Sequence, residues 1–209
     1  MNEQFTPWSS IWLRPKETIR IIIDTNPRQN MMLLAFLGGI GQAFANASAQ
    51  GMGKFLPLPT LVTVVLLAGP LGGLLYLYLG GWLLQIIGQR FGGSATKEEL
   101  RVAIAWSWVP IVSTLPLWGV KYILFRNEVF LPEKTFTQSQ PVLANLHSLI
   151  GFIDFVIIVW SLYIFFNAVS EVNRFSFGRS IATVLIAGLI ITIPSMLLLA
   201  LCAPALHPM

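Results

Sequence analysis

The sequence predicts an all-α integral membrane protein with five transmembrane helices and an amphipathic helix before the first of them. Three observations lead to this fold class. The 209 residues are 55% hydrophobic and only 11% charged, whereas a soluble domain carries about 25% charged residues. Apolar segments of about 20 residues recur, which is the length that crosses a bilayer as a helix. The sequence also lacks the alternating pattern of barrel strands, so helices must satisfy the backbone in lipid.

The predicted spans follow one another along the chain with short polar connections. They cover residues 31–50, 58–87, 100–125, 142–169 and 181–201. Prolines inside the second, third and fifth spans should kink those helices. We therefore divide the chain into a cytoplasmic amphipathic arm at 1–30, a five-span domain at 31–203 and a short extracytoplasmic tail at 204–209.

Basic residues are distributed unevenly between the two sets of flanks. Those on the side opposite the N-terminus are Lys54, Lys121, Arg126 and Lys134. Those on the N-terminal side are Arg14, Lys16, Arg20, Arg28, Arg90, Lys97, Arg101, Arg174 and Arg179. Because Lys and Arg accumulate in cytoplasmic loops, we expect a cytoplasmic N-terminus and an outer C-terminus in the cytoplasmic membrane.

The arm contains the stretch RPKETIRIIIDTNP, which begins with a proline suited to a first helical turn. Lys16, Arg20 and Asp24 repeat every fourth residue, and isoleucines occupy the other side. This pattern predicts an amphipathic helix on the inner leaflet, with Trp8 and Trp12 as interfacial anchors. A connector with no role beyond anchoring is the alternative.

The stretch GGSATKEELRVAIAWSWVP lies between the second and third spans. Gly92 and Gly93 should end the preceding helix and turn the chain. Thr96 followed three residues later by Glu99 matches a capping box. A helix should therefore begin near Lys97 and run into the third span.

These features together resemble the Yip domain family (Ypt/Rab-interacting proteins), in its short bacterial branch. The similarity covers roughly residues 8–203. It rests on RPKETIR before a span, FGG followed by ELRVAIAWSWVP, and IVWSLYIFFNAVSEVNRFSFGRSIA before the last helix. The resemblance implies five spans, a cytoplasmic N-terminus and a bacterial inner membrane. Eukaryotic members are linked to vesicle trafficking, Rab GTPases and Golgi organisation, but this chain lacks their long cytosolic N-terminal region.

One carboxylate lies deep in an apolar span, in HSLIGFIDFVIIVWSLYIFF. An ionised Asp154 there costs about 2.5–3.5 kcal/mol on insertion scales, so it should face other helices, accept hydrogen bonds or be protonated. We expect a polar pocket between the first, second and fourth spans, and structural hydrogen bonding is an equally weighted alternative. The pocket residues would be Asp154, His147, Ser161, Gln42, Asn46 and Gln85. His147 and Asp154 are about 10 Å apart along a helix, so no metal site is expected.

A second candidate region is the predicted inner face. Glu171 and Arg174 are three residues apart, which suits either an ordinary ion pair or a docking point beside the 92–99 loop. The residues of this face would be Gly92, Gly93, Thr96, Glu99, Asn167, Glu171 and Arg174.

The second span also carries a glycine step, Gly69 and Gly73, that lets backbones approach closely. Packing within one chain and a dimer seam are both open uses of it. The expected partners are membrane lipids, other membrane proteins and, through this span, a second copy of the chain. No nucleic acid or cofactor is expected.

The sequence contains no HExxH, GxSxG, P-loop or CxxC motif. We therefore expect a non-enzymatic membrane protein of the Yip type that organises the bilayer or scaffolds other membrane proteins. The alternative is a small transporter, channel or lipid-moving protein with Asp154 as a proton- or cation-responsive group. The lack of an inverted repeat weighs against this alternative.

Overall fold

The computed structural model describes residues 6–131 and 140–206, and every regular element in those ranges is a helix. The α-helices are α1 (Pro7–Leu13), α2 (Pro15–Thr25), α3 (Met31–Ala49), α4 (Leu58–Arg90), α5 (Lys97–Ser107), α6 (Val109–Ser113), α7 (Leu115–Phe125), α9 (Pro141–Asn173) and α10 (Phe177–Leu206). Two 3₁₀ turns, η1 (Met52–Lys54) and η2 (Arg126–Phe130), lie in the connections.

Four helical segments of the described chain are long and apolar enough to cross a membrane. They are α3, α4, the segment Lys97–Phe130 and α9. A shorter apolar stretch, Phe177–Ile190, begins α10. The prediction of a helical multi-pass membrane protein is therefore confirmed. The fifth span predicted at 181–201 includes residues whose side chains the structure does not describe. That span and the tail at 204–209 therefore stay predictions.

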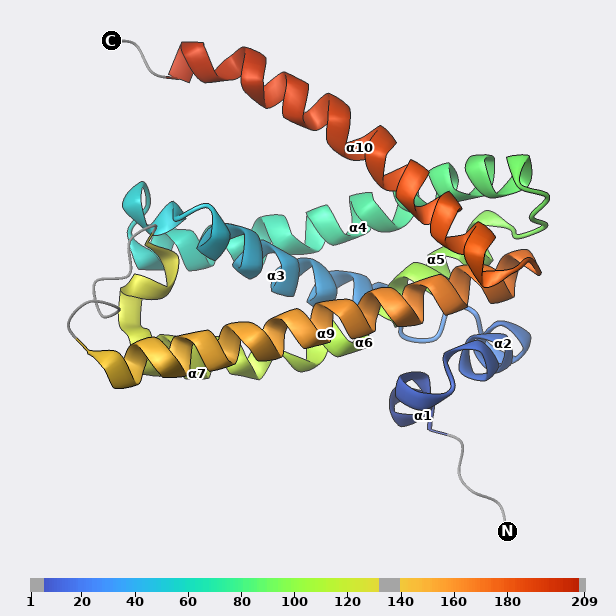
Figure 1. Ribbon diagram of the computed structural model, residues 1–209, viewed down its shortest axis with the longest axis horizontal. Helices are drawn as coiled ribbons and strands as arrows, with labels where there is room; N and C mark the ends of the chain where they lie inside the picture. Colours follow the sequence, from blue (N-terminus) through green and yellow to red (C-terminus); the bar gives the residue numbers. More distant parts are fainter. Residues whose placement is uncertain (1–5, 132–139, 207–209) are drawn as a thin grey trace.

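The long helices run side by side along one axis of the molecule (Figure 1). α3 and α9 flank the row formed by α5, α6 and α7, and α4 packs along α3 and α5. The small helices α1 and α2 lie at one end, which we call the arm end; η1 and η2 lie at the other, which we call the hairpin end. α10 starts against α4 and α9 near the arm end and then diverges from both (Figure 1).

The third span is a broken helix, and each break has a local cause. Its start is the predicted capping box: the hydroxyl of Thr96 accepts from the backbone N–H of Glu99 at 3.3 Å, and Glu99 accepts from the N–H of Thr96 at 2.7 Å. Pro110 and Pro116 stand in the first turns of α6 and α7, where a proline has no N–H to contribute to a continuous ladder. The span therefore changes direction after Trp108 and after Thr114.

The centre of the arm half of the molecule is α5. The side chains from Val102 to Trp106 are fully buried, and α4, α9, α3 and α2 surround them. A second apolar cluster, which includes Leu61, Phe125 and Phe130, lies at the hairpin end. The core is therefore divided along the long axis, with α3, α7 and α9 bordering the space between the two clusters.

α3 and α4 cross at very short range because glycines line the contact. A Cβ atom at Gly69 would lie 2.8 Å from the Cα of Ile40, and one at Gly39 would lie 2.9 Å from the Cα of Gly73. Lipid tails are as apolar as leucine, so close backbone packing is what holds such helices together. The glycine step of the second span thus packs within the chain. A second copy of the chain bound through the glycine-rich second span stays a prediction.

Replacing Gly73 with leucine should lower the stability of the protein by separating α3 from α4, at a cost of about 1–3 kcal/mol for an overpacked contact. Gly72→Leu is the matched control, because a Cβ at Gly72 meets no atom within 4 Å. Thermal unfolding in detergent should show a lower midpoint for Gly73→Leu alone. Equal midpoints for the two variants would contradict the close crossing.

Candidate functional site

Asp154 forms an ion pair with a residue that the sequence analysis did not select. Lys121 on α7 donates from Nζ to Asp154 Oδ2 on α9 at 2.5 Å. The Lys121 side chain is 9% exposed and the Asp154 side chain 30% exposed. Lys121 Nζ also lies 4.0 Å from the centroid of the Trp118 ring, which places the cation against an aromatic face. The charges in these two apolar segments therefore neutralise each other.

The signal for this pair was present in the sequence but was interpreted differently. Lys121 lies inside the span predicted at 100–125, yet the charge count assigned it to the outer flank. A lysine and an aspartate within neighbouring apolar spans each need a partner of opposite charge. Spacing along one helix cannot reveal such a pair, because its members lie on different helices.

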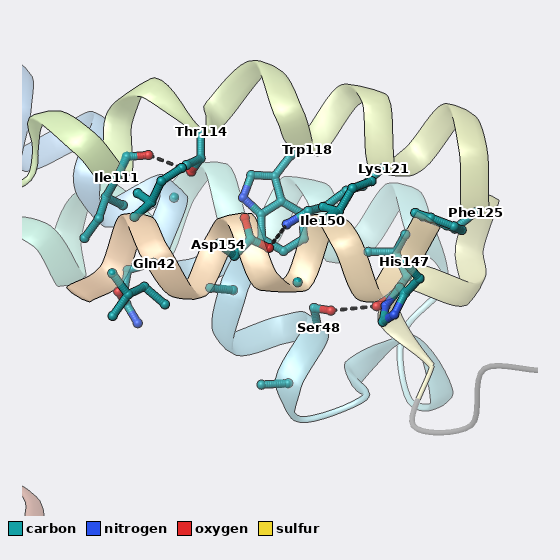
Figure 2. Close-up of a pocket in the computed structure, with 17 residues that line it drawn as sticks. Gln42, Ser48, Ile111, Thr114, Trp118, Lys121, Phe125, His147, Ile150 and Asp154 are labelled. Carbon is teal, nitrogen blue, oxygen red and sulfur yellow. Dashed lines mark hydrogen bonds and ion pairs between the residues drawn. The ribbon is translucent and has the colours of Figure 1, made fainter. Parts of the chain in front are cut away.

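A cavity of about 380 Å³ lies beside the ion pair, between the pair and α3 (Figure 2). Its walls come from α3, α6, α7, η2 and α9, and most of the lining is apolar. The sequence predicted this pocket between the first, second and fourth spans. That position was wrong in one respect, because α4 contributes none of the described residues that line the cavity, and the third span does so instead.

The structure brings together some of the predicted pocket residues. Asp154, His147 and Gln42 line the cavity. Asn46 is exposed and is not among the lining residues, but its Oδ1 accepts a hydrogen bond from Nε2 of Gln42 at 3.4 Å. Asn46 therefore lies next to the cavity.

Two predicted members of the pocket bond elsewhere. Ser161 is buried and its hydroxyl donates to the carbonyl oxygen of Ser107 at 2.7 Å, so it joins α9 to the end of α5. Gln85 donates to the carbonyl oxygen of Ala95 at 3.4 Å and joins α4 to the 92–96 loop. These two side chains form structural hydrogen bonds, as the alternative prediction for the polar residues of the spans expects.

Further polar groups on the cavity wall were not selected from the sequence. The Ser48 hydroxyl donates to the carbonyl oxygen of Val129 at 2.7 Å, and the Thr114 hydroxyl donates to that of Ile111 at 2.7 Å (Figure 2). Because each hydroxyl hydrogen is already used, both groups can offer only an acceptor to a ligand. Across the described residues, no cluster of three metal-ligating side chains occurs, here or elsewhere.

The N-terminal arm packs on the arm end of the bundle through its apolar side. Ile11, Ile19 and Ile22 are at most 1% exposed, and α2 lies against α9 and α5. Trp160 Nε1 donates to the carbonyl oxygen of Trp12 at 3.2 Å, which adds a polar contact from α9 to α1. The apolar side of the predicted amphipathic helix thus contacts protein in this structure, and its charged side is exposed.

Two ion pairs join the arm to the bundle. Arg20 on α2 pairs with Glu171 on α9, and Arg28 Nε lies 3.0 Å from Glu98 Oε1 on α5. An ion pair between Glu171 and Arg174 was one of the two uses predicted for these residues; instead Glu171 pairs with Arg20, and Arg174 is an exposed residue with φ of 56° that ends α9. An exposed pair contributes about 0–1 kcal/mol, and a fully buried isoleucine about 1.5–3 kcal/mol. The isoleucines therefore hold the arm in place, and the ion pairs orient it.

The other residues of the predicted inner face have mostly structural roles. Gly92 has φ of +81°, and the N–H of Gly93 donates to the carbonyl oxygen of Gly88 at 2.8 Å, so both residues form the turn after α4. The side chains of Thr96 and Glu99 serve the capping box. Asn167 is buried and donates to the carbonyl oxygen of Tyr163 at 2.8 Å, so it does not belong to an exposed face.

Comparison with known proteins identifies one family. A family model described as the Yip1 domain matches residues 9–199. No curated protein sequence matches the chain, and no solved structure does. The matched region contains the arm from residue 9 onward and every described residue that lines the cavity.

Removing one charge of the Lys121–Asp154 pair should destabilise the protein, towards the lower end of the roughly 3–5 kcal/mol seen when a buried pair loses a partner. Asp154→Leu should be worse than Lys121→Met, because it leaves the more buried charge without a partner. The double variant should recover much of the loss. These changes are measured as thermal midpoints in detergent, and additive effects of the two single variants would refute the pairing.

Proposed function

The chain belongs to the Yip1 domain family. On this premise we propose that it is a non-enzymatic multi-pass membrane protein that organises the bilayer or scaffolds other membrane proteins. The proposal includes five spans in the inner membrane of a bacterium, with the N-terminus in the cytoplasm and the C-terminus outside. Its working surface is the arm end. The observation that carries this assignment is the packing of α2 onto α9 and α5, with α1 packed against α2 and α6.

A docked arm suits a scaffold because it presents charged side chains in a defined arrangement. Lys16, Glu17, Arg20 and Asp24 are exposed on α2, while the isoleucines on its other side are buried. A partner that binds an ordered surface does not have to order it first, which lowers the entropic cost of association. The partners that fit are other membrane proteins and anionic lipid headgroups next to the basic residues.

The arm end is the side that we assign to the cytoplasm. Most of the Lys and Arg residues that flank the spans occur on this side of the predicted topology, as the positive-inside rule requires. Arg90 ends α4 and Lys97 begins α5, and α4 ends and α5 begins at the arm end of the bundle (Figure 1). The hairpin end would then face outward, with the cavity in the outer half of the bundle.

A second candidate function is supported by a different observation. The cavity exposes part of Asp154 within the bundle, as expected for a small transporter, channel or lipid-moving protein with a proton- or cation-responsive group. The Lys121 partner weakens the cation-binding form of this candidate, because a cation would have to displace the ammonium group.

The scaffold proposal predicts that detaching the arm abolishes partner capture. Ile19→Asp places a carboxylate at a fully buried position and should release α2, whereas Leu13→Asp places it where the side chain is 83% exposed. A photo-cross-linking amino acid at Lys16 would be introduced into both variants in cells. We expect wild-type cross-links to membrane proteins in Leu13→Asp and their loss in Ile19→Asp. Unchanged cross-links in Ile19→Asp would exclude the docked arm as the working surface.

The second candidate predicts flux of protons or monovalent cations through liposomes that contain the purified protein. Asp154→Asn should reduce that flux, because the amide keeps the shape of the side chain but carries no charge and leaves Lys121 without its counter-ion. Flux would be followed with pH- and potassium-sensitive dyes. Wild-type liposomes that are no leakier than protein-free ones would exclude the ion-transport form.

A further inference from the structure

We propose that the cavity between α3, α7 and α9 binds the headgroup of a neutral, hydroxyl-bearing amphiphile, with diacylglycerol as the representative chemistry. The hydroxyl group would lie at the Lys121–Asp154 pair. The inference uses the same cavity as the second candidate function, but it requires binding and not movement of the ligand. Binding without ion flux would therefore retain the inference and remove the ion-transport form of that function.

The charge of the site selects a neutral headgroup. Lys121 and Asp154 cancel each other at 2.5 Å, so the site has no net charge to attract an ion. A cationic headgroup drawn to Asp154 would be repelled by the adjacent ammonium group, and an anionic one drawn to Lys121 would be repelled by the carboxylate. Both repulsions are strong in a segment surrounded by apolar residues, because the effective dielectric constant is low there.

The remaining hydrogen-bonding capacity of the pair selects a hydroxyl group. An ammonium group has three N–H donors, and a carboxylate accepts at two oxygens. Within the described part of the chain, the mutual contact is the one hydrogen bond that either group makes. A partner must therefore accept from Lys121 and donate to Asp154 together. A hydroxyl is the smallest neutral group that does both.

The walls of the cavity suit the apolar part of such a ligand. Ile111, Ile150, Ile157 and Ile158 line it, together with the ring of Trp118. Its volume of about 380 Å³ falls near the lower end of the roughly 300–1,000 Å³ that is usual for ligand pockets. This volume holds a small headgroup and the first part of an acyl chain, and the rest of the chain would extend between the helices.

The site is open beside the carboxylate and closed behind the ammonium group. Asp154 is more than three times as exposed as Lys121, whose side chain is held against Trp118. Gly151 lies one turn before Asp154 on α9, and a Cβ atom there would meet nothing within 4 Å. The ligand therefore approaches along the Gly151 side of α9. Figure 2 shows the Asp154 side chain directed towards Lys121.

The test is photolabelling of the purified protein in phosphatidylcholine liposomes that contain a diacylglycerol with a diazirine in one acyl chain. Labelled peptides should come from α3, α7 and α9. Unlabelled dioleoylglycerol should compete. Phosphatidic acid, a cationic dioleoyl trimethylammonium lipid and trioleoylglycerol should not, since they are anionic, cationic and without a free hydroxyl, respectively.

Two variants localise the binding. Gly151→Leu fills the open space and should reduce labelling by about tenfold, the change expected for loss of one charge-assisted hydrogen bond. Gly119→Leu is the matched control, because a Cβ there also meets nothing within 4 Å and Gly119 does not line the cavity. The double variant Lys121→Met/Asp154→Leu should reduce labelling while keeping the apolar walls.

The thermal midpoint of each variant is measured first, so that a change in labelling refers to folded protein. Labelling that Gly151→Leu leaves unchanged would overturn the proposal, and so would equal competition by any of the three control lipids. Selective competition by dioleoylglycerol together with loss in both cavity variants would establish it. A parallel flux assay on the same liposomes separates this outcome from that of the transport function.

Discussion

The contact between Lys121 and Asp154 constrains the hairpin half of this molecule more than any other. A single charged side chain in an apolar helix must be compensated, and a side chain of opposite charge on a neighbouring helix does this directly. Meeting this requirement sets how α7 and α9 lie relative to each other. The breaks after Trp108 and Thr114 allow it, because they let the third span change direction before it reaches α9. The cavity lies beside the pair that these constraints produce.

The arm half is held together mainly by apolar packing, and its ion pairs only orient the arm. Gly39, Gly69 and Gly73 let α3 and α4 approach until their backbones touch, and α5 fills the centre with fully buried side chains. Close packing of this kind replaces the hydrophobic driving force that is missing between helices in lipid. The result is a compact half that supports the arm and a more open half that contains the cavity.

The division between the halves bears on function. The arm end combines an ordered, charged surface with a tight core, which suits contact with other macromolecules. The cavity combines apolar walls with one neutral, polar centre, which suits an amphiphile taken from the bilayer. One protein can carry both features, because the two surfaces lie at different positions along the helices and share few residues.

The sequence by itself determined the helical membrane class, the family, the start of the third span at the capping box and the presence of a polar site at Asp154. These depend on local composition, on spacing within one helix and on motif order, all of which are visible along the chain. The tertiary structure decided the partner of Asp154, the partner of Glu171, the use of the glycine step within the chain and the helices that enclose the cavity. Each of these depends on which faces of separate helices meet, and that is set by packing between segments far apart in sequence.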